Sequence, residues 1–72
     1  MKVYEIGLDE EWIKVLCFCY KARNIKEIMG VLDGTNYSEL YVKTQKLPEF
    51  VKNKYLFKDG DKWTLNKVKY EV

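Results

Sequence analysis

The chain contains no histidine, two cysteines and one proline, and these shortages exclude several kinds of site. Two thiols cannot supply the three or four ligands that a zinc ion needs, so we expect no metal. There is no glycine-rich phosphate loop, and no serine or cysteine nucleophile stands beside a base. We therefore expect no catalytic residue, no cofactor and no small-molecule ligand, which argues against an enzyme.

A long apolar run is also missing, and a bilayer-spanning helix needs about 20 apolar residues. The start, MKVYEIGLDEE, lacks the basic and apolar regions of a signal peptide. We therefore expect a cytoplasmic protein that does not enter a membrane. Cys17 and Cys19 would point about 200° apart on a helix, so we expect buried thiols that are not bonded to each other. An intermolecular disulfide or a reactive thiol is the alternative.

What the sequence does contain is enough apolar material for one small core. Its 72 residues are 47% hydrophobic and 15% aromatic, which predicts a single domain spanning residues 1–72. Residues 1–33 carry five cations and six acids (5 − 6 = −1), whereas residues 34–72 carry eight lysines and five acids (8 − 5 = +3). A surface that faces a polyanion would therefore lie in the C-terminal half. The alternative is an ordinary solvated lysine-rich face.

Helical spacing of apolar residues begins at Leu8, with Asp9 as the expected N-cap. The buried stripe would comprise Leu8, Trp12, Val15, Leu16 and Cys19. Three further apolar residues, Ile13, Phe18 and Tyr20, lie outside this stripe. Since a helix this apolar is typical of burial on two sides, we assign these three to a homodimer interface.

Two more helices are expected before the C-terminal hairpin. Asn24 and Glu27 form a capping-box pattern that opens the second helix, and Gly34 suits the left-handed residue that ends it. The third runs from about Asn36 to Asn53 and is kinked or restarted at Pro48. Its buried stripe would be Tyr37, Leu40, Thr44, Leu47 and Val51.

The stretch KYLFKDGDKWTLN predicts a β-hairpin with a two-residue turn at Asp59-Gly60. In this register Leu56 faces Trp63 and shares the core side with Leu65, while Tyr55 and Phe57 lie opposite. KVYEI at 2–6 and VKYEV at 68–72 predict short strands at both termini, which would pair within one chain or across a dimer.

The order of elements resembles the winged helix-turn-helix DNA-binding family over roughly residues 8–66. The resemblance is carried by NIKEIMGVL, DGTNYSELYVKTQK and LPEFVKNKYLFKDGDKWTLN. It implies an α+β winged helix with a three-helix core, a C-terminal hairpin wing and short strands at both termini. The terminal strands are similar to those of small archaeal and archaeal-virus regulators, and a viral protein would act in the host cytoplasm. Lys54 departs from the pattern, because the family usually has a glycine before the first wing strand.

The resemblance further implies that the third helix enters the major groove of double-stranded DNA and that the wing contacts the backbone. With the stripe above, the outward residues would be Ser38, Glu39, Val42, Lys43, Gln45 and Lys46. A slightly turned helix would instead expose Tyr41, Thr44 and Gln45, and Gln45 and Lys46 stay accessible in both registers. The expected DNA-binding residues are therefore Ser38, Tyr41, Lys43, Thr44, Gln45, Lys46, Lys54, Lys58 and Lys62.

The function expected from this resemblance is sequence-specific DNA binding by a homodimeric transcriptional regulator. The alternative is a winged-helix module that assembles with other proteins and does not bind DNA. In that case the acidic wing tip and the side with Tyr55 and Phe57 would form the contact surface.

Overall fold

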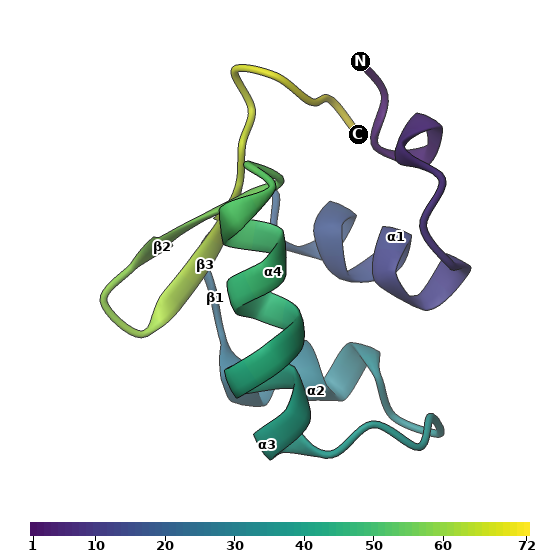
Figure 1. Cartoon of the computed structure of the whole chain (residues 1–72), viewed down its shortest axis with the longest axis vertical. Helices are drawn as coiled ribbons and strands as arrows, with labels where there is room; N and C mark the ends of the chain where they lie inside the picture. Colours follow the sequence, from purple (N-terminus) through teal and green to yellow (C-terminus); the bar gives the residue numbers. More distant parts are fainter.

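Helices and a three-stranded antiparallel sheet enclose one core in the computed structural model, which describes residues 1–72 (Figure 1). The sheet order is β1-β3-β2. This α+β arrangement is compatible with a winged helix. In chain order the elements are the 3-10 helix η1 (Val3–Ile6), α1 (Glu10–Phe18), β1 (Arg23–Asn24), α2 (Ile25–Val31), α3 (Glu39–Tyr41), the π-helical η2 (Val42–Lys46), α4 (Leu47–Lys52), β2 (Leu56–Asp59) and β3 (Lys62–Leu65).

The core lies where the helices meet the inner side of the sheet. Trp12 is central, with its ring 5.6 Å from Phe50 and 4.8 Å from Tyr37. The stripe expected on α1 is confirmed, since Trp12, Val15, Leu16 and Cys19 are all buried and Leu8 packs against them. The buried apolar residues are Val3, Trp12, Val15, Leu16, Cys19, Ile28, Leu32, Val42, Leu47, Phe50, Leu56, Trp63, Leu65 and Tyr70.

Local hydrogen bonds explain where the second helix begins. The Glu27 N–H donates to Asn24 Oδ1 (2.9 Å) and the Asn24 N–H donates to Glu27 Oε1 (3.0 Å), which confirms the capping box. Gly34 adopts a left-handed conformation (φ 87) beyond the end of α2, as expected. Asp9 occupies the N-cap position of α1, but its side chain makes no capping hydrogen bond.

The segments α3, η2 and α4 follow one another as a single helical run from Glu39 to Lys52, with a π-helical turn before Pro48. Pro48 has no N–H, and its ring would collide with the carbonyl of Thr44 in a regular α-helix. The preceding turn is wider, so the Leu47 N–H donates to the Val42 carbonyl, five residues back. The run begins at Glu39 and not at Asn36, and Pro48 lies in the first turn of α4, as expected.

This wide turn changes which residues of the third helix are buried. Val42 and Leu47 are fully buried, whereas Leu40 is 72% exposed and Thr44 is exposed. The stripe with Leu40 and Thr44 inside and Val42 outside was therefore wrong. The register that exposes Tyr41, Thr44 and Gln45 is confirmed, because all three are exposed.

The hairpin forms, but with a different turn. Leu56 pairs with Leu65 and Lys58 with Trp63, so the expected pairing of Leu56 with Trp63 was wrong. The loop is Gly60-Asp61, and Gly60 is its one residue at positive φ (62°). A glycine in the first loop position suits a type II′ turn, whereas an Asp59-Gly60 type I′ turn would put Asp59 at positive φ. The two-residue shift preserves the faces, so Leu56, Trp63 and Leu65 are still buried.

Two other strand expectations changed. The short strand β1, which we did not predict, pairs Arg23 with Trp63 and Asn24 with Lys62. The predicted terminal strands were wrong, because residues 3–6 form η1 and the two ends share a single parallel bridge between Lys2 and Glu71. The Lys2 N–H donates to Glu5 Oε1 (2.7 Å) and Gly7 takes φ 87, and these local features favour a turn over a strand.

The termini therefore lie side by side within one chain (Figure 1). The Val3 N–H donates to the Glu71 carbonyl at 2.9 Å. Tyr70 is buried between these ends and the base of the wing, where its ring lies 5.7 Å from Tyr55. The expected outward position of Tyr55 was thus wrong in part, since this ring is half-buried, while Phe57 is exposed.

Candidate nucleic-acid interface

The exposed side of α3 and η2 is the first half of the candidate interface. Ser38 caps the helix by accepting a hydrogen bond from the Tyr41 N–H (3.1 Å), which leaves its own hydroxyl hydrogen free. Lys43 and Gln45 are exposed, as expected for residues that reach DNA. Thr44 is also exposed, but its hydroxyl donates to the Leu40 carbonyl at 2.6 Å. This hydroxyl is therefore not free to donate to a phosphate, although Thr44 is among the residues expected to bind DNA.

Lys46 does not lie on this side of the helix. Its side chain is only 20% exposed, and its ammonium lies 5.2 Å from the ring of Trp12 and 5.4 Å from that of Phe50. It also pairs with Glu49 at 3.4 Å. The expectation that Lys46 is accessible in both registers was wrong, because the π turn rotates it toward α1.

The wing is the second half of the candidate interface. Lys58 and Lys62 are exposed on β2 and β3, and neither forms an ion pair, although Asp59 and Asp61 are close by in the chain. The Lys58 ammonium lies 5.5 Å from the ring of Trp63, its cross-strand partner. Both lysines therefore remain available to an outside anion, with two carboxylates at the tip.

Lys54 occupies the joint between α4 and the wing. Its backbone is left-handed (φ 65), and it is the one residue other than glycine at positive φ. The Tyr55 N–H donates to the Phe50 carbonyl (2.9 Å) and the Lys54 N–H donates to the Val51 carbonyl (3.1 Å), which together make a Schellman motif. Lys54 thus takes the conformation that a glycine would adopt at this point, and its side chain is exposed.

A buried asparagine holds this joint to the end of the wing. Asn66 is 7% exposed, and its amide donates to the Lys54 carbonyl at 2.8 Å. The Asn66 N–H donates to the Tyr55 carbonyl at 2.9 Å. These bonds fix the direction in which the wing leaves α4.

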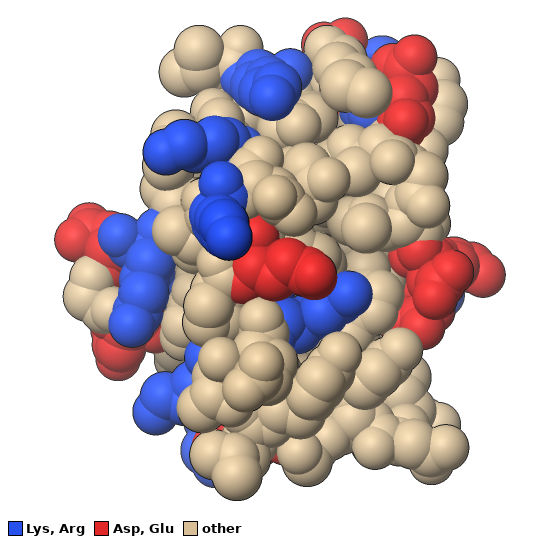
Figure 2. Space-filling view, viewed as in Figure 1, with Lys and Arg blue, Asp and Glu red and all other residues tan.

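Ion pairing is uneven between the two halves of the chain. Of the eight lysines in residues 34–72 only Lys46 has an ion-pair partner, which leaves seven (8 − 1 = 7). Among the five cations of residues 1–33 only Lys21 lacks one. Figure 2 shows lysines over the wing and the end of α4, with acidic side chains at the tip of the wing and others at the opposite edge, over α1. Unpaired positive charge therefore gathers on the wing side.

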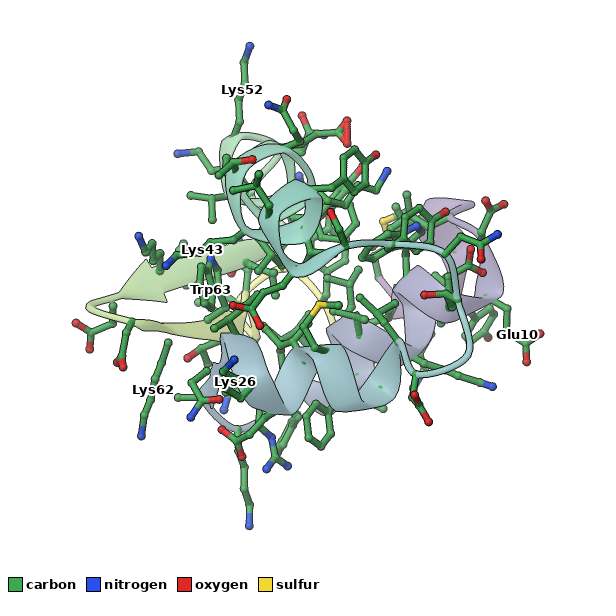
Figure 3. The ribbon with its side chains drawn as sticks, turned by 90° about the horizontal axis from the view of Figure 1, so that it is seen from below. Glu10, Lys26, Lys43, Lys52, Lys62 and Trp63 are labelled. Carbon is green, nitrogen blue, oxygen red and sulfur yellow. The ribbon has the colours of Figure 1, made fainter.

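A second view, from below, agrees with this uneven distribution of charge. Figure 3 places Lys43, Lys62 and Lys26 on the wing side, with Glu10 at the far side. Lys26 is engaged there, since its ammonium lies 3.1 Å from Glu39 at the start of α3. The structure thus brings Lys43 of the helix and Lys62 of the wing to the same side of the molecule.

The pKa shifts of titratable groups near the interface have simple physical causes. The hydrogen bond from the Asn24 N–H, followed by Arg23 beside it, lowers the pKa of Glu27. Arg23 is thereby occupied, with its guanidinium 3.4 Å from Glu27 and 3.9 Å from the ring centre of Phe18. Burial raises the pKa of Cys19 to about 12, and burial also raises the pKa of Cys17. Both thiols are free, as expected.

The three apolar residues assigned to a dimer interface lie at the α1 end of the molecule. Ile13 and Phe18 are half-buried, and Tyr20 is 51% exposed. Cations cover two of the rings, since Arg23 lies over Phe18 and the Lys67 ammonium lies 4.4 Å from the ring of Tyr20. The structure contains one chain, so the dimer stays a prediction.

The exposure of Leu40 is the feature of this surface that sequence reasoning missed. The one available signal was Pro48, since a proline eight residues further on favours an irregular turn between the two.

The surface has no enclosed pocket. None of the helices is long and apolar enough to cross a membrane. A comparison of the chain with protein-family models, curated proteins and solved structures found no match.

Proposed function

We propose that this protein is a winged-helix transcriptional regulator that binds double-stranded DNA sequence-specifically as a homodimer. The exposed side of α3 and η2 would enter the major groove, and the wing would lie on the sugar-phosphate backbone. The topology supports this proposal, because β1 joins the first two helices and the hairpin follows directly after the third. No cofactor is needed for such binding.

The observation that carries the proposal is the set of unpaired lysines beside an exposed polar helix. Lys54, Lys58 and Lys62 can neutralise phosphates, and each contact adds about 0.9 to the slope of log affinity against log salt. Gln45 can form two hydrogen bonds with adenine, and Lys43 now takes the place of Lys46 as the lysine able to reach guanine. Ser38 and Tyr41 flank these residues and can donate to phosphate oxygens.

Two substitutions test this assignment on duplexes selected from a random library. Gln45→Ala should weaken binding to the selected duplex by about 1–3 kcal/mol and leave binding to random duplex nearly unchanged. Lys46→Ala should leave discrimination unchanged and lower stability by about 1 kcal/mol, because it removes packing over Trp12 and Phe50. Fluorescence anisotropy and thermal unfolding measure the two effects.

Lys14→Ala is the matched control, because Lys14 is paired with Glu10 on α1, away from the wing. It should change neither binding nor discrimination. Equal losses for Gln45→Ala on selected and random duplexes would remove base recognition and leave backbone binding only.

The alternative is a winged-helix module for protein assembly. It is favoured by the exposed apolar side chains of Leu40 (72%) and Phe57 (48%). A salt titration separates the two functions, because electrostatic binding to random duplex should be strong at about 50 mM salt. If no binding is seen there, the assembly function replaces the proposed one.

A further inference from the structure

Leu40 is an apolar side chain at the outermost part of the third helix. It is 72% exposed and is the second residue of α3. Thr44 lies one turn further along the same side, as the hydrogen bond from its hydroxyl to the Leu40 carbonyl shows. Because this bond occupies the hydroxyl, the methyl group is the part of Thr44 left for outside contacts.

The neighbours of Leu40 show that it lies in the middle of the exposed surface. On one side Lys43 points toward the wing (Figure 3). On the other side the Tyr41 ring stacks on Tyr37, with centroids 5.7 Å apart and planes 12° from parallel, and Tyr37 packs against Trp12 of α1. Leu40 and Thr44 therefore lie between the wing lysines and the aromatic stack.

The charges around Leu40 favour an anionic occupant. Lys43 has no ion-pair partner, and neither do Lys58 and Lys62 of the wing. The nearest acid in the chain, Glu39, is already paired with Lys26 at 3.1 Å. An apolar protein surface placed over Leu40 would remove water from the unpaired Lys43 without providing a counter-charge. A nucleic acid would supply phosphates on both sides of an apolar contact.

We infer that Leu40, together with the methyl group of Thr44, contacts thymine C5-methyl groups in the major groove. The thymine methyl is the one apolar group that base pairs present there, so Leu40 selects sites with a thymine at the centre of each half-site. This inference rests on the proposed function, since it assigns a base preference to the same helix.

Deoxyuridine provides the direct test, because it keeps the hydrogen-bonding groups of thymidine and lacks only the C5-methyl. The probe is the duplex selected with the wild-type protein, with its thymines replaced one at a time. One or two central replacements should weaken wild-type binding about fourfold each, as for loss of one buried methyl-sized group (~0.8 kcal/mol). Replacements elsewhere should have no effect.

Leu40→Ala completes a double-mutant cycle. It should weaken binding to the thymine duplex by a similar factor, and uracil at the sensitive position should then cause a smaller further loss than in the wild type, limited to the contact of the Thr44 methyl group. Val68→Ala is the matched control, because it shortens another apolar side chain that is 96% exposed and lies outside the helices. Its response to uracil should equal that of the wild type.

The outcomes distinguish a failure of the thymine contact from a failure of DNA binding itself. If the wild-type protein binds a selected duplex and uracil weakens binding nowhere, or weakens it equally for Leu40→Ala, the thymine contact is excluded and DNA binding stands. If the protein binds no duplex at about 50 mM salt, both proposals fail, and Leu40 becomes a contact for a protein partner.

Discussion

Lys54 takes a backbone conformation that suits glycine. A left-handed conformation strains a residue with a Cβ by about 1–2 kcal/mol, and replacing Lys54 by glycine would remove this strain. Part of the resulting gain in stability is offset, because glycine is more flexible in the unfolded chain. Lys54→Gly should therefore raise the free energy of unfolding by about 0.5–1 kcal/mol. The midpoint of thermal unfolding should rise by about 2–8 °C.

The same substitution removes a proposed phosphate contact, so stability and DNA affinity should change in opposite directions. The salt slope should fall by about 0.9 while the protein becomes more stable. Lys54→Ala is the control, since it removes the ammonium and keeps the strain, and it should lower the slope without the gain in stability. A destabilised Lys54→Gly variant would contradict the Schellman assignment.

Cys19 makes stability depend on pH in the alkaline range. Burial raises the pKa of Cys19 to about 12 in the folded chain, from its ordinary value of 9.0. Below about pH 8 both states keep the proton, so the thiol has no effect on the pH dependence there. Between about pH 9 and 12 only the unfolded state loses it, so the free energy of unfolding should fall by up to about 1.4 kcal/mol per pH unit.

Cys19→Ala isolates this contribution from the lysines and tyrosines that also titrate at alkaline pH. Urea unfolding at pH 7, 9 and 10 should show a steeper alkaline loss for the wild type than for the variant, whatever their difference at pH 7. Parallel curves for the two proteins would show that Cys19 ionises as readily in the folded chain as in the unfolded one.

At the scale of elements, the sequence was informative where structure depends on local contacts. The capping box at Asn24 and Glu27, the buried stripe of α1 and the buried side of the hairpin all follow from spacing over a few residues. The capping box was predicted correctly because it is stabilised by neighbours in the chain, and the buried sides of α1 and the hairpin because the spacing of their apolar residues shows which side faces the core.

Of the features that were missed, one depends on contacts between distant segments and the others are local irregularities of the backbone. β1 has two residues and exists because β3 provides its partners, so no periodic pattern could show it. The termini have strand-like composition, but the Glu5 carboxylate and Gly7 stabilise a turn there instead. For the candidate site, Pro48 predicted an irregular helix, but the π turn that leaves Leu40 exposed and brings Lys46 toward α1 could not be placed from the sequence.

The wing offers a prediction at the same scale. Lys58→Ala and Lys62→Ala should each lower the salt slope by about 0.9 and weaken binding to all duplexes alike, since phosphate contacts carry no sequence information. Asp59→Asn should have the opposite effect on affinity, because it removes a negative charge from the tip. Salt titrations between about 50 and 200 mM measure both.

Lys67→Ala is a matched control for the wing lysines, because the Lys67 ammonium already donates a hydrogen bond to the Tyr20 carbonyl at 2.7 Å. It should leave the salt slope unchanged. If Lys58→Ala, Lys62→Ala and Lys67→Ala all have the same salt slope, the wing does not contact DNA.

At the scale of the whole molecule, the two ends of the fold differ in charge and in surface chemistry. The wing and the third helix carry unpaired lysines, while α1 lies at the opposite, acidic edge (Figures 1 and 2). Ile13 and Phe18 lie on α1, and the exposed Tyr20 follows the C-terminal end of this helix, beside Lys67; these three residues form the proposed dimer surface. Pairing two copies through it would keep both wings and both third helices free for DNA.

The dimensions of the chain are consistent with such a pair on DNA. The molecule measures 29 × 26 × 19 Å, so equivalent points on two copies related by a two-fold axis can lie up to about twice one of these lengths apart. Half-sites one helical turn apart are about 34 Å from centre to centre. A pair that meets at α1 can therefore place its third helices in successive major grooves of a palindromic site.

Light scattering tests this arrangement. The wild-type protein should have twice the mass of the 8.6 kDa chain, 2 × 8.6 = 17.2 kDa, at micromolar concentration or on its selected duplex. Tyr20→Asp should return the mass to 8.6 kDa, because it places a charge within the proposed interface. Phe57→Asp, the same kind of change at a ring 48% exposed on the wing, should leave the dimer intact. A wild-type mass of one chain both free and on DNA would exclude the dimer, and the target would then be a single half-site bound by one copy.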